Sequence, residues 1–241
     1  NGYRLNQKMA KGLIKAGIDV LRISCIGYDR ESYSHWMSLD VFDEVRDNVK
    51  YFVNLNKEMG GISEVHIHHL VTDITKIEQE IKKYRENWSD YTGAKSEIWL
   101  MHNWAGSEIE LGYHRATMTA AASGQRSCGR PFSPLLQVRA GGLDGHSAAV
   151  VACCMVLGKD SEGVLGHLDN QTIEEVITGS HYTALRNAHT QKDFDKISYC
   201  AECDQLYNIP ESLVWTNIEA RKYGQSKVVS EMDHRTFNAE N

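Results

Sequence analysis

The cysteines in the second half of the chain constrain it more than any other feature. Cys200 and Cys203 form a Cys-x-x-Cys pair, which places two thiolates on one tight turn, close enough to bind the same metal centre. Cys128 and the neighbours Cys153 and Cys154 lie upstream. Two cysteines from these separate elements complete a four-thiolate shell, which holds either a zinc ion or an iron–sulfur cluster.

Composition narrows the class of protein. The 241 residues are 41% hydrophobic and 24% charged, with a formal net charge of -6, and this mild acidity argues against a nucleic-acid partner. No apolar run reaches the roughly 20 residues needed to span a bilayer, and no signal peptide opens the chain, so we expect no membrane partner. Six cysteines are too few for a disulfide scaffold and indicate metal binding in a reducing cytoplasm.

The first hundred residues alternate between helical and strand patterns. Strands are expected over 18–26, 65–71 and 97–101. Helices are expected from Leu5 to a stop at Gly17, from Val41 to Gly60-Gly61, and from Ile74 to Trp88 with Thr72 or Asp73 as the cap. Such apolar strands between helices predict a parallel sheet, open or curved into a barrel, with ligands at the C-terminal ends of the strands.

The chain changes character near residue 105, where Gly, Ser and Ala become frequent. Two short strands over 135–138 and 148–152 are expected to form a hairpin, with the glycines of 140–145 in the turn. Thr172 opens a capping box with Glu175. A second helix is expected around Tyr182, a last helix over 211–223, and a polar tail over 224–241.

The order of these elements resembles that of a radical S-adenosylmethionine (SAM) enzyme with a C-terminal SPASM or twitch-type auxiliary-cluster domain. The resemblance covers most of residues 1–206. Its motifs are Asn1-Gly2, Leu21 to Asp29, Asn103-Trp104, Ala152-Cys-Cys-Met155, Val164 to Leu168, Tyr182 to Arg186 with His189 and Phe194, and Cys200-Ala-Glu-Cys203.

The resemblance implies an α/β fold in three parts. Residues 1–106 correspond to the C-terminal half of a partial (βα)6 TIM-like barrel. Residues 107–206 correspond to a small α+β SPASM/twitch domain made of a β-hairpin plus helices, and 207–241 form a C-terminal helix and polar tail. The family's Cys-x3-Cys-x2-Cys motif, which binds the SAM-cleaving cluster, has no counterpart here. We therefore expect part of a longer enzyme that does not cleave SAM alone.

The ligand set follows from the resemblance and from the cysteine spacing. Cys128, Cys153, Cys200 and Cys203 are predicted to bind one auxiliary [4Fe-4S] cluster. Cys153 is preferred to Cys154 because neighbouring residues of a strand point to opposite faces, and the family pattern agrees. Cys154 is then expected to pack inside as a small hydrophobe. A structural zinc module and a non-catalytic cluster carrier are the alternatives.

Further candidate residues lie on the predicted sheet. The resemblance implies that Ser24 and Asn103 contact SAM, although Ser24 is also able to bond the backbone. His66 and His68 face the same side of one strand, as two metal ligands would, but no nearby Asp or Glu supplies a third, so pocket-lining histidines are favoured. Cys25 is expected to be a buried thiol.

The resemblance also implies a reaction and its partners. In such enzymes a reduced cluster gives SAM an electron, and the resulting radical abstracts a hydrogen atom from a peptide or small-molecule substrate. A reductant such as flavodoxin or ferredoxin supplies the electrons. Nothing in the loops of this chain selects the substrate.

Overall fold

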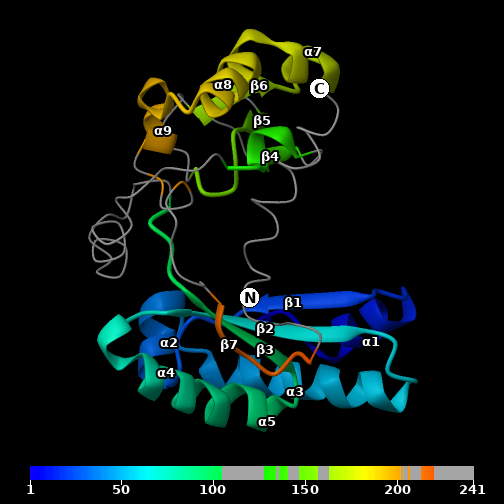
Figure 1. Ribbon diagram of the computed structural model, residues 1–241. Helices are drawn as coiled ribbons and strands as arrows, with labels where there is room; N and C mark the ends of the chain where they lie inside the picture. Colours follow the sequence, from blue (N-terminus) through cyan, green and yellow to red (C-terminus); the bar gives the residue numbers. More distant parts are fainter. Residues whose placement is uncertain are drawn as a thin grey trace. The chain divides into compact units, whose positions relative to one another are not determined.

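The computed structural model describes residues 1–104, 128–133, 136–140, 147–156, 163–201, 203, 206 and 213–219. The chain divides into two compact units (Figure 1). The first contains Asn1–Met101 and the strand Leu213–Thr216, and the second is built from the described residues between His102 and Pro210. None of the described helices has the length and apolar character that crossing a membrane requires.

The first unit is built on a four-stranded sheet in the order β1-β2-β3-β7. β1 (Val20–Ser24) pairs in parallel with β2 (Glu64–Val71), and β2 pairs in parallel with β3 (Lys95–Leu100). This confirms the predicted parallel, adjacent arrangement of three strands. β7 (Leu213–Thr216) joins the far side of β3 in the antiparallel direction.

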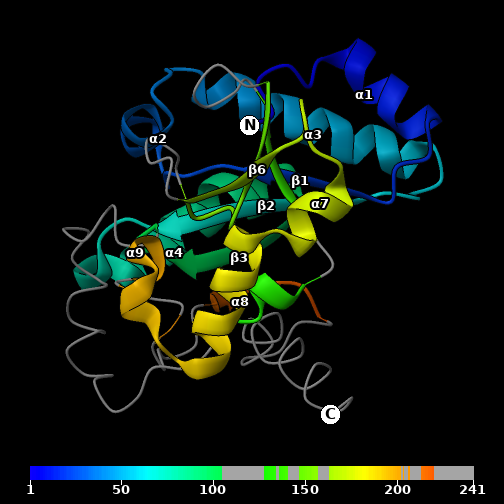
Figure 2. The ribbon, with the colours of Figure 1, turned by 90° about the horizontal axis from the view of Figure 1, so that it is seen from above.

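Helices fill the connections of this sheet. Figure 1 shows α3, α4 and α5 along one of its faces, and Figure 2 shows the same sheet from above. α2 follows β1 and was not foreseen from the sequence, although Asp29 caps it by accepting a hydrogen bond from the Ser32 N–H. The helix expected over 74–88 is divided into several segments. The helical elements are α1 (Gln7–Lys15), α2 (Arg30–Met37), α3 (Phe42–Glu58), η1 (Ile74–Lys76), α4 (Ile77–Tyr84), the π-helical η2 (Arg85–Ser89) and α5 (Asp90–Thr92).

Aromatic packing holds the loop after β1 against these helices. The Trp88 ring lies 5.5 Å from Tyr33 and 5.3 Å from Phe42, centroid to centroid, and its indole N–H donates to the Gly27 carbonyl at 2.9 Å. Gly27 has a φ of 116°, and a Cβ built there would lie 2.3 Å from the Tyr33 backbone. Only glycine therefore allows the end of β1 to approach α2 this closely.

The second unit contains the predicted hairpin and a third strand. β4 (Gln137–Ala140) pairs antiparallel with β5 (Ala148–Val151), and β5 pairs antiparallel with β6 (Val164–His167). The glycines expected in the turn at 141–145 lie outside the described residues. The capping box is confirmed, since the Thr172 hydroxyl accepts from the Glu175 N–H. The helical elements are η3 (Arg130–Phe132), α7 (Ile173–Thr178), α8 (Ser180–Gln191), η5 (Phe194–Lys196) and α9 (Ser198–Ala201).

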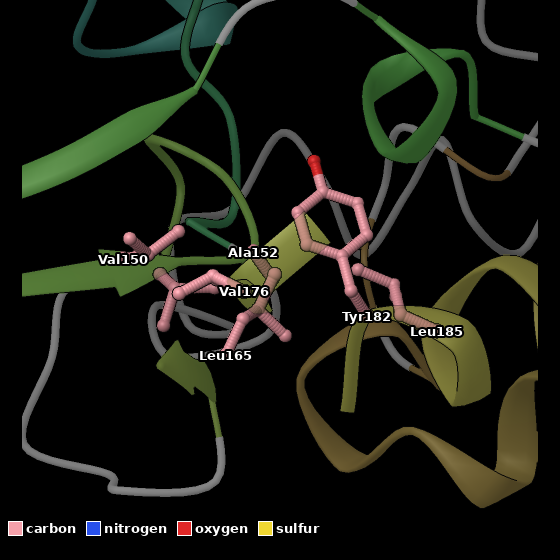
Figure 3. Packing of buried hydrophobic residues seen from close by; sticks show 7 residues of the cluster. Val150, Ala152, Leu165, Val176, Tyr182 and Leu185 are labelled. Atoms are coloured by element: carbon pink, nitrogen blue, oxygen red, sulfur yellow. The ribbon is translucent and has the colours of Figure 1, made fainter. Parts of the chain in front are cut away.

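An apolar core joins the sheet of the second unit to its helices. Figure 3 shows this core, to which β5, β6, α7 and α8 all contribute. A Cβ built on Gly166 would lie 2.7 Å from the Val176 side chain, so β6 and α7 approach closely. Cys153 and Cys200 pack against the edge of the same core. The buried members of the core are Val150, Ala152, Val156, Leu165, Val176, Tyr182 and Leu185.

The helix expected over 211–223 is wrong for Leu213–Thr216, which form strand β7. The run Leu-Val-Trp-Thr is rich in residues that favour strands, and the edge of β3 offers it backbone partners. Leu213–Thr216 consequently belong to the first unit, as part of its sheet. The boundary between the units falls at Met101, five residues before the predicted one.

Candidate metal centre

The structure brings the four predicted cysteine ligands to one pocket. Cys128, Cys153, Cys200 and Cys203 all line one cavity. Cys154 does not line it. Most of the remaining lining is apolar, from Pro131, Ala152, Met155, Leu185 and Leu206, with Tyr199, Arg130 and His189 completing it. Four thiols from separate segments therefore share one largely apolar cavity, although their role as ligands remains a prediction.

Short turns present the paired cysteines to this cavity. The Cys203 N–H donates to the Cys200 carbonyl at 3.0 Å, which closes the turn expected of a Cys-x-x-Cys pair. The Cys200 N–H donates to the Ile197 carbonyl at 2.8 Å and ties the same turn to the residue after η5. Cys128 and Cys203 are both buried and share a small apolar cluster with Phe194.

Helix α8 anchors the segment that carries Cys128. The Cys128 N–H donates to His189 Nδ1 at 3.4 Å, and Arg186 Nε donates to the Pro131 carbonyl at 3.1 Å. His189 is 1% exposed, and its ring lies 5.1 Å from the ring of Phe194. Burial lowers the pKa of His189 to about 4, so the imidazole is neutral near pH 7 and accepts the backbone bond. These two bonds position Cys128 at the cavity.

Burial also shifts the pKa values of two of the thiols. It raises the pKa of the Cys153 thiol and that of the Cys200 thiol, and the nearby Cys153 and Cys128 add to the effect at Cys200. Thiolate, not thiol, is the form that binds metal. Metal binding at this cavity must therefore release protons, and it becomes weaker as the pH falls.

The expectation that Cys154 packs inside is wrong. The residue is exposed, and the Arg130 guanidinium donates to its Sγ at 3.1 Å. Cys153 and Cys154 lie beyond the end of β5 in a turn, where the Val156 N–H donates to the Cys153 carbonyl at 3.3 Å. Strand alternation therefore does not apply to this pair. Burial acts to lower the pKa of Arg130, but the neighbouring cysteines outweigh it and raise that pKa.

The two predicted SAM contacts occupy different units. Ser24 is the last residue of β1, is exposed, and lies opposite His68 in the parallel register. Asn103 follows the C-terminal end of β3 by three residues and is fully buried. Each stands at or just beyond the C-terminal end of a parallel strand, where ligands of such sheets bind. A common site that includes both stays a prediction.

His66 and His68 of β2 each have a carboxylate beside the Nε2 atom of the ring. The rings of His66 and His68 are stacked at 6.5 Å between centroids, so they share a face as expected. His66 Nε2 lies 2.9 Å from a Glu64 carboxylate oxygen, and His68 Nε2 lies 3.3 Å from one of Glu97. The expectation that no nearby acid accompanies them is thus wrong. The two-residue spacing already places Glu64 on the face of His66, whereas Glu97 is revealed only by the pairing of β2 with β3.

These histidines do not form a metal site. Within the described parts of the chain, no three His, Cys, Asp or Glu side chains are arranged to hold a single metal ion. Cys25 is fully buried, as expected, and burial raises the pKa of its thiol. It belongs to the first unit and lies among the core residues there.

Comparison with known families supports a cluster-binding role for the second unit. Residues 145–204 match the family model SPASM, described as an iron–sulfur cluster-binding domain. This range includes Cys153, Cys200 and Cys203, whereas Cys128 lies before it. Neither the curated proteins nor the solved structures contain a match to the chain.

Proposed function

Taking the SPASM iron–sulfur domain of the second unit as the starting point, we propose that the chain binds one [4Fe-4S] cluster through Cys128, Cys153, Cys200 and Cys203. One observation carries the proposal: these four thiols, from three separate segments, line a single cavity. Cys128 belongs to this set although the family match does not include it.

The spacing of the cysteines favours a cluster over the zinc alternative. Structural zinc sites usually pair two Cys-x-x-Cys knuckles. In this sequence Cys200 and Cys203 form one such pair, whereas Cys128 and Cys153 are 25 residues apart. The match of residues 145–204 to an iron–sulfur cluster-binding domain supports the same choice.

The first unit supports the larger assignment, an auxiliary-cluster portion of a radical SAM enzyme. β1, β2 and β3 are parallel neighbours joined through helices, as in one half of a partial (βα)6 barrel. We propose that Ser24 and Asn103, at or beyond strand ends, contact SAM, and that the substrate is a peptide or small molecule. Flavodoxin or ferredoxin is the proposed reductant. A reducing cytoplasm is the proposed compartment, because six cysteines in 241 residues are too few for a disulfide scaffold.

Within this scheme the bound cluster supplies one-electron transfer, and the protein supplies orientation and exclusion of water. Met155, Leu185 and Leu206 line the cavity with apolar surface. His189, through its bond to the Cys128 N–H, fixes the direction from which the first cysteine enters. The 241 residues contain no Cys-x3-Cys-x2-Cys motif, so we expect no cleavage of SAM by this chain alone.

The test is anaerobic reconstitution of the chain with iron and sulfide, followed by metal analysis. We expect about four iron and four sulfide ions per chain and a brown chromophore. Cys203→Ser should abolish this binding, and Cys25→Ser, which removes a thiol of the first unit, should preserve it. Full iron content in the Cys203 variant, or a colourless protein that retains zinc, would overturn the proposal.

A further inference from the structure

The cavity that holds the four cysteines also receives a positive charge. Among the described residues that line it, Arg130 is the one arginine or lysine, and arginine keeps its positive charge at neutral pH. Arg130 opens η3, two residues after Cys128. One of its N–H groups donates to Cys154 Sγ at 3.1 Å, and the guanidinium also interacts electrostatically with Cys128 and Cys153.

Two contacts fix the backbone of the segment that carries Arg130. Arg130 precedes Pro131, whose carbonyl accepts a hydrogen bond from Arg186 of α8 at 3.1 Å. The guanidinium of Arg186 also lies 4.1 Å from the ring centroid of Tyr182, a core residue. Arg130 is half-buried, and a charge that is partly removed from water interacts more strongly with its neighbours than an exposed one.

We propose that Arg130 raises the reduction potential of the cluster bound in this cavity. The inference rests on the proposed function, because it requires that a cluster binds there. Four thiolates and a [4Fe-4S]²⁺ core carry a net charge of about -2, which becomes about -3 when the core accepts one electron. A nearby guanidinium stabilises the more negative state. No bond breaks, and the arginine keeps its proton throughout.

Arg130 has a second contact that offers a competing explanation. Its hydrogen bond to Cys154 holds that thiol outside the cavity. In an Arg130→Gln variant, Cys154 is free to compete with Cys153 as a ligand, and such an exchange would itself change the potential. Cys154→Ser removes the competing thiol while Arg130 remains, so the double variant separates the effect of charge from the effect of ligand exchange.

The experiment is a redox titration of the reconstituted full chain with dithionite as the one-electron reductant, followed by electron paramagnetic resonance. Arg130→Gln and the Arg130→Gln/Cys154→Ser double variant should both lower the equilibrium constant for reduction of the cluster at least tenfold. For one electron this corresponds to a reduction potential that is lower by about 59 mV. Arg130→Lys, which keeps the charge, should stay close to the wild type. Arg139→Gln is the matched control, because Arg139 lies in the same unit and does not line the cavity.

The outcomes distinguish this inference from the proposed function. An iron-free wild type refutes the proposed function itself. Equal potentials for the Arg130→Gln and Arg139→Gln variants, at equal iron content, refute the role of Arg130 alone. Recovery of the wild-type potential in the double variant assigns the effect to ligand exchange and also refutes that role. If Arg130→Gln loses its iron, the reduced wild type labelled with ¹⁵N-arginine decides: a guanidinium nitrogen coupling to the cluster supports the proposal, and its absence overturns it.

Discussion

Glu80 provides the sharpest test of how the loops beyond the sheet are held. Its carboxylate is 1% exposed and accepts four hydrogen bonds. The donors are the Thr72 N–H, the Thr72 hydroxyl, the Asp73 N–H and His69 Nε2, at 2.7 to 3.1 Å. His69 Nδ1 in turn accepts the Gly27 N–H at 3.2 Å. One acid thus fixes the loops that follow β1 and β2, next to Ser24.

Glu80→Gln keeps the size of the side chain but replaces one oxygen by an NH₂ group. The better orientation of the amide places its NH₂ group where Oε1 of Glu80 lies. The Thr72 hydroxyl then turns and accepts a hydrogen bond from this NH₂ group, but the Asp73 N–H is left without an acceptor. A buried donor without an acceptor costs about 1–3 kcal/mol, and each charge-assisted bond that becomes neutral loses about 1 kcal/mol. The free energy of unfolding should therefore fall by about 3–5 kcal/mol.

Urea unfolding followed by tryptophan fluorescence measures this loss, because of the five tryptophans all but Trp104 lie in the first unit. Glu78→Gln, an exposed position on the same helix α4, is the matched control and should change stability by less than about 0.5 kcal/mol. Equal urea midpoints for the two variants would refute the reasoning.

The same carboxylate predicts a dependence on pH. Burial raises the pKa of Glu80, but the bonds from His69 and Thr72 outweigh it and lower that pKa below the usual 4.5. As the pH falls through about 4.5, the unfolded chain takes up this proton before the folded chain does. The contribution of Glu80 is therefore complete above that pH and is lost on acidification, so the stability difference between wild type and Glu80→Gln should shrink.

Two further pairs of substitutions test the site and the fold. Cys154→Ser should retain the full iron content of the reconstituted chain and Cys153→Ser should lose it, because the Cys153 thiol lines the cavity and the Cys154 thiol does not. The reverse result in metal analysis would reassign the ligand. Gly27→Ala should destabilise the first unit by more than about 2 kcal/mol in urea unfolding, because its Cβ would meet the Tyr33 backbone at 2.3 Å with φ at 116°. Gly12→Ala should instead stabilise the chain by about 0.5–1 kcal/mol, because this helical position has open space; equal effects at the two glycines would contradict the packing described.

The amino-acid sequence by itself determined the elements whose signals are local. Apolar runs between helical patterns predicted that β1, β2 and β3 are parallel neighbours, because a helical crossover returns the chain so that the next strand runs in the same direction. The capping box at Thr172 and the glycine stop of α1 at Gly17 depend on a few adjacent residues, and both were predicted. The family resemblance and the cysteine spacing together identified the four thiols that share the cavity.

Only the tertiary structure decided what depends on distant partners. Leu213–Thr216 became a strand because the edge of β3, over a hundred residues away in sequence, offers it hydrogen bonds. Arg130 reaches the thiols because α8 anchors the carbonyl of Pro131, a contact between residues 55 positions apart. Cys154 is exposed because the chain turns after β5. Side chains alternate between the two faces only within a strand, so the alternation does not extend to Cys153 and Cys154. Local patterns carry none of these long-range contacts, and each of them affects either the cavity or the sheet.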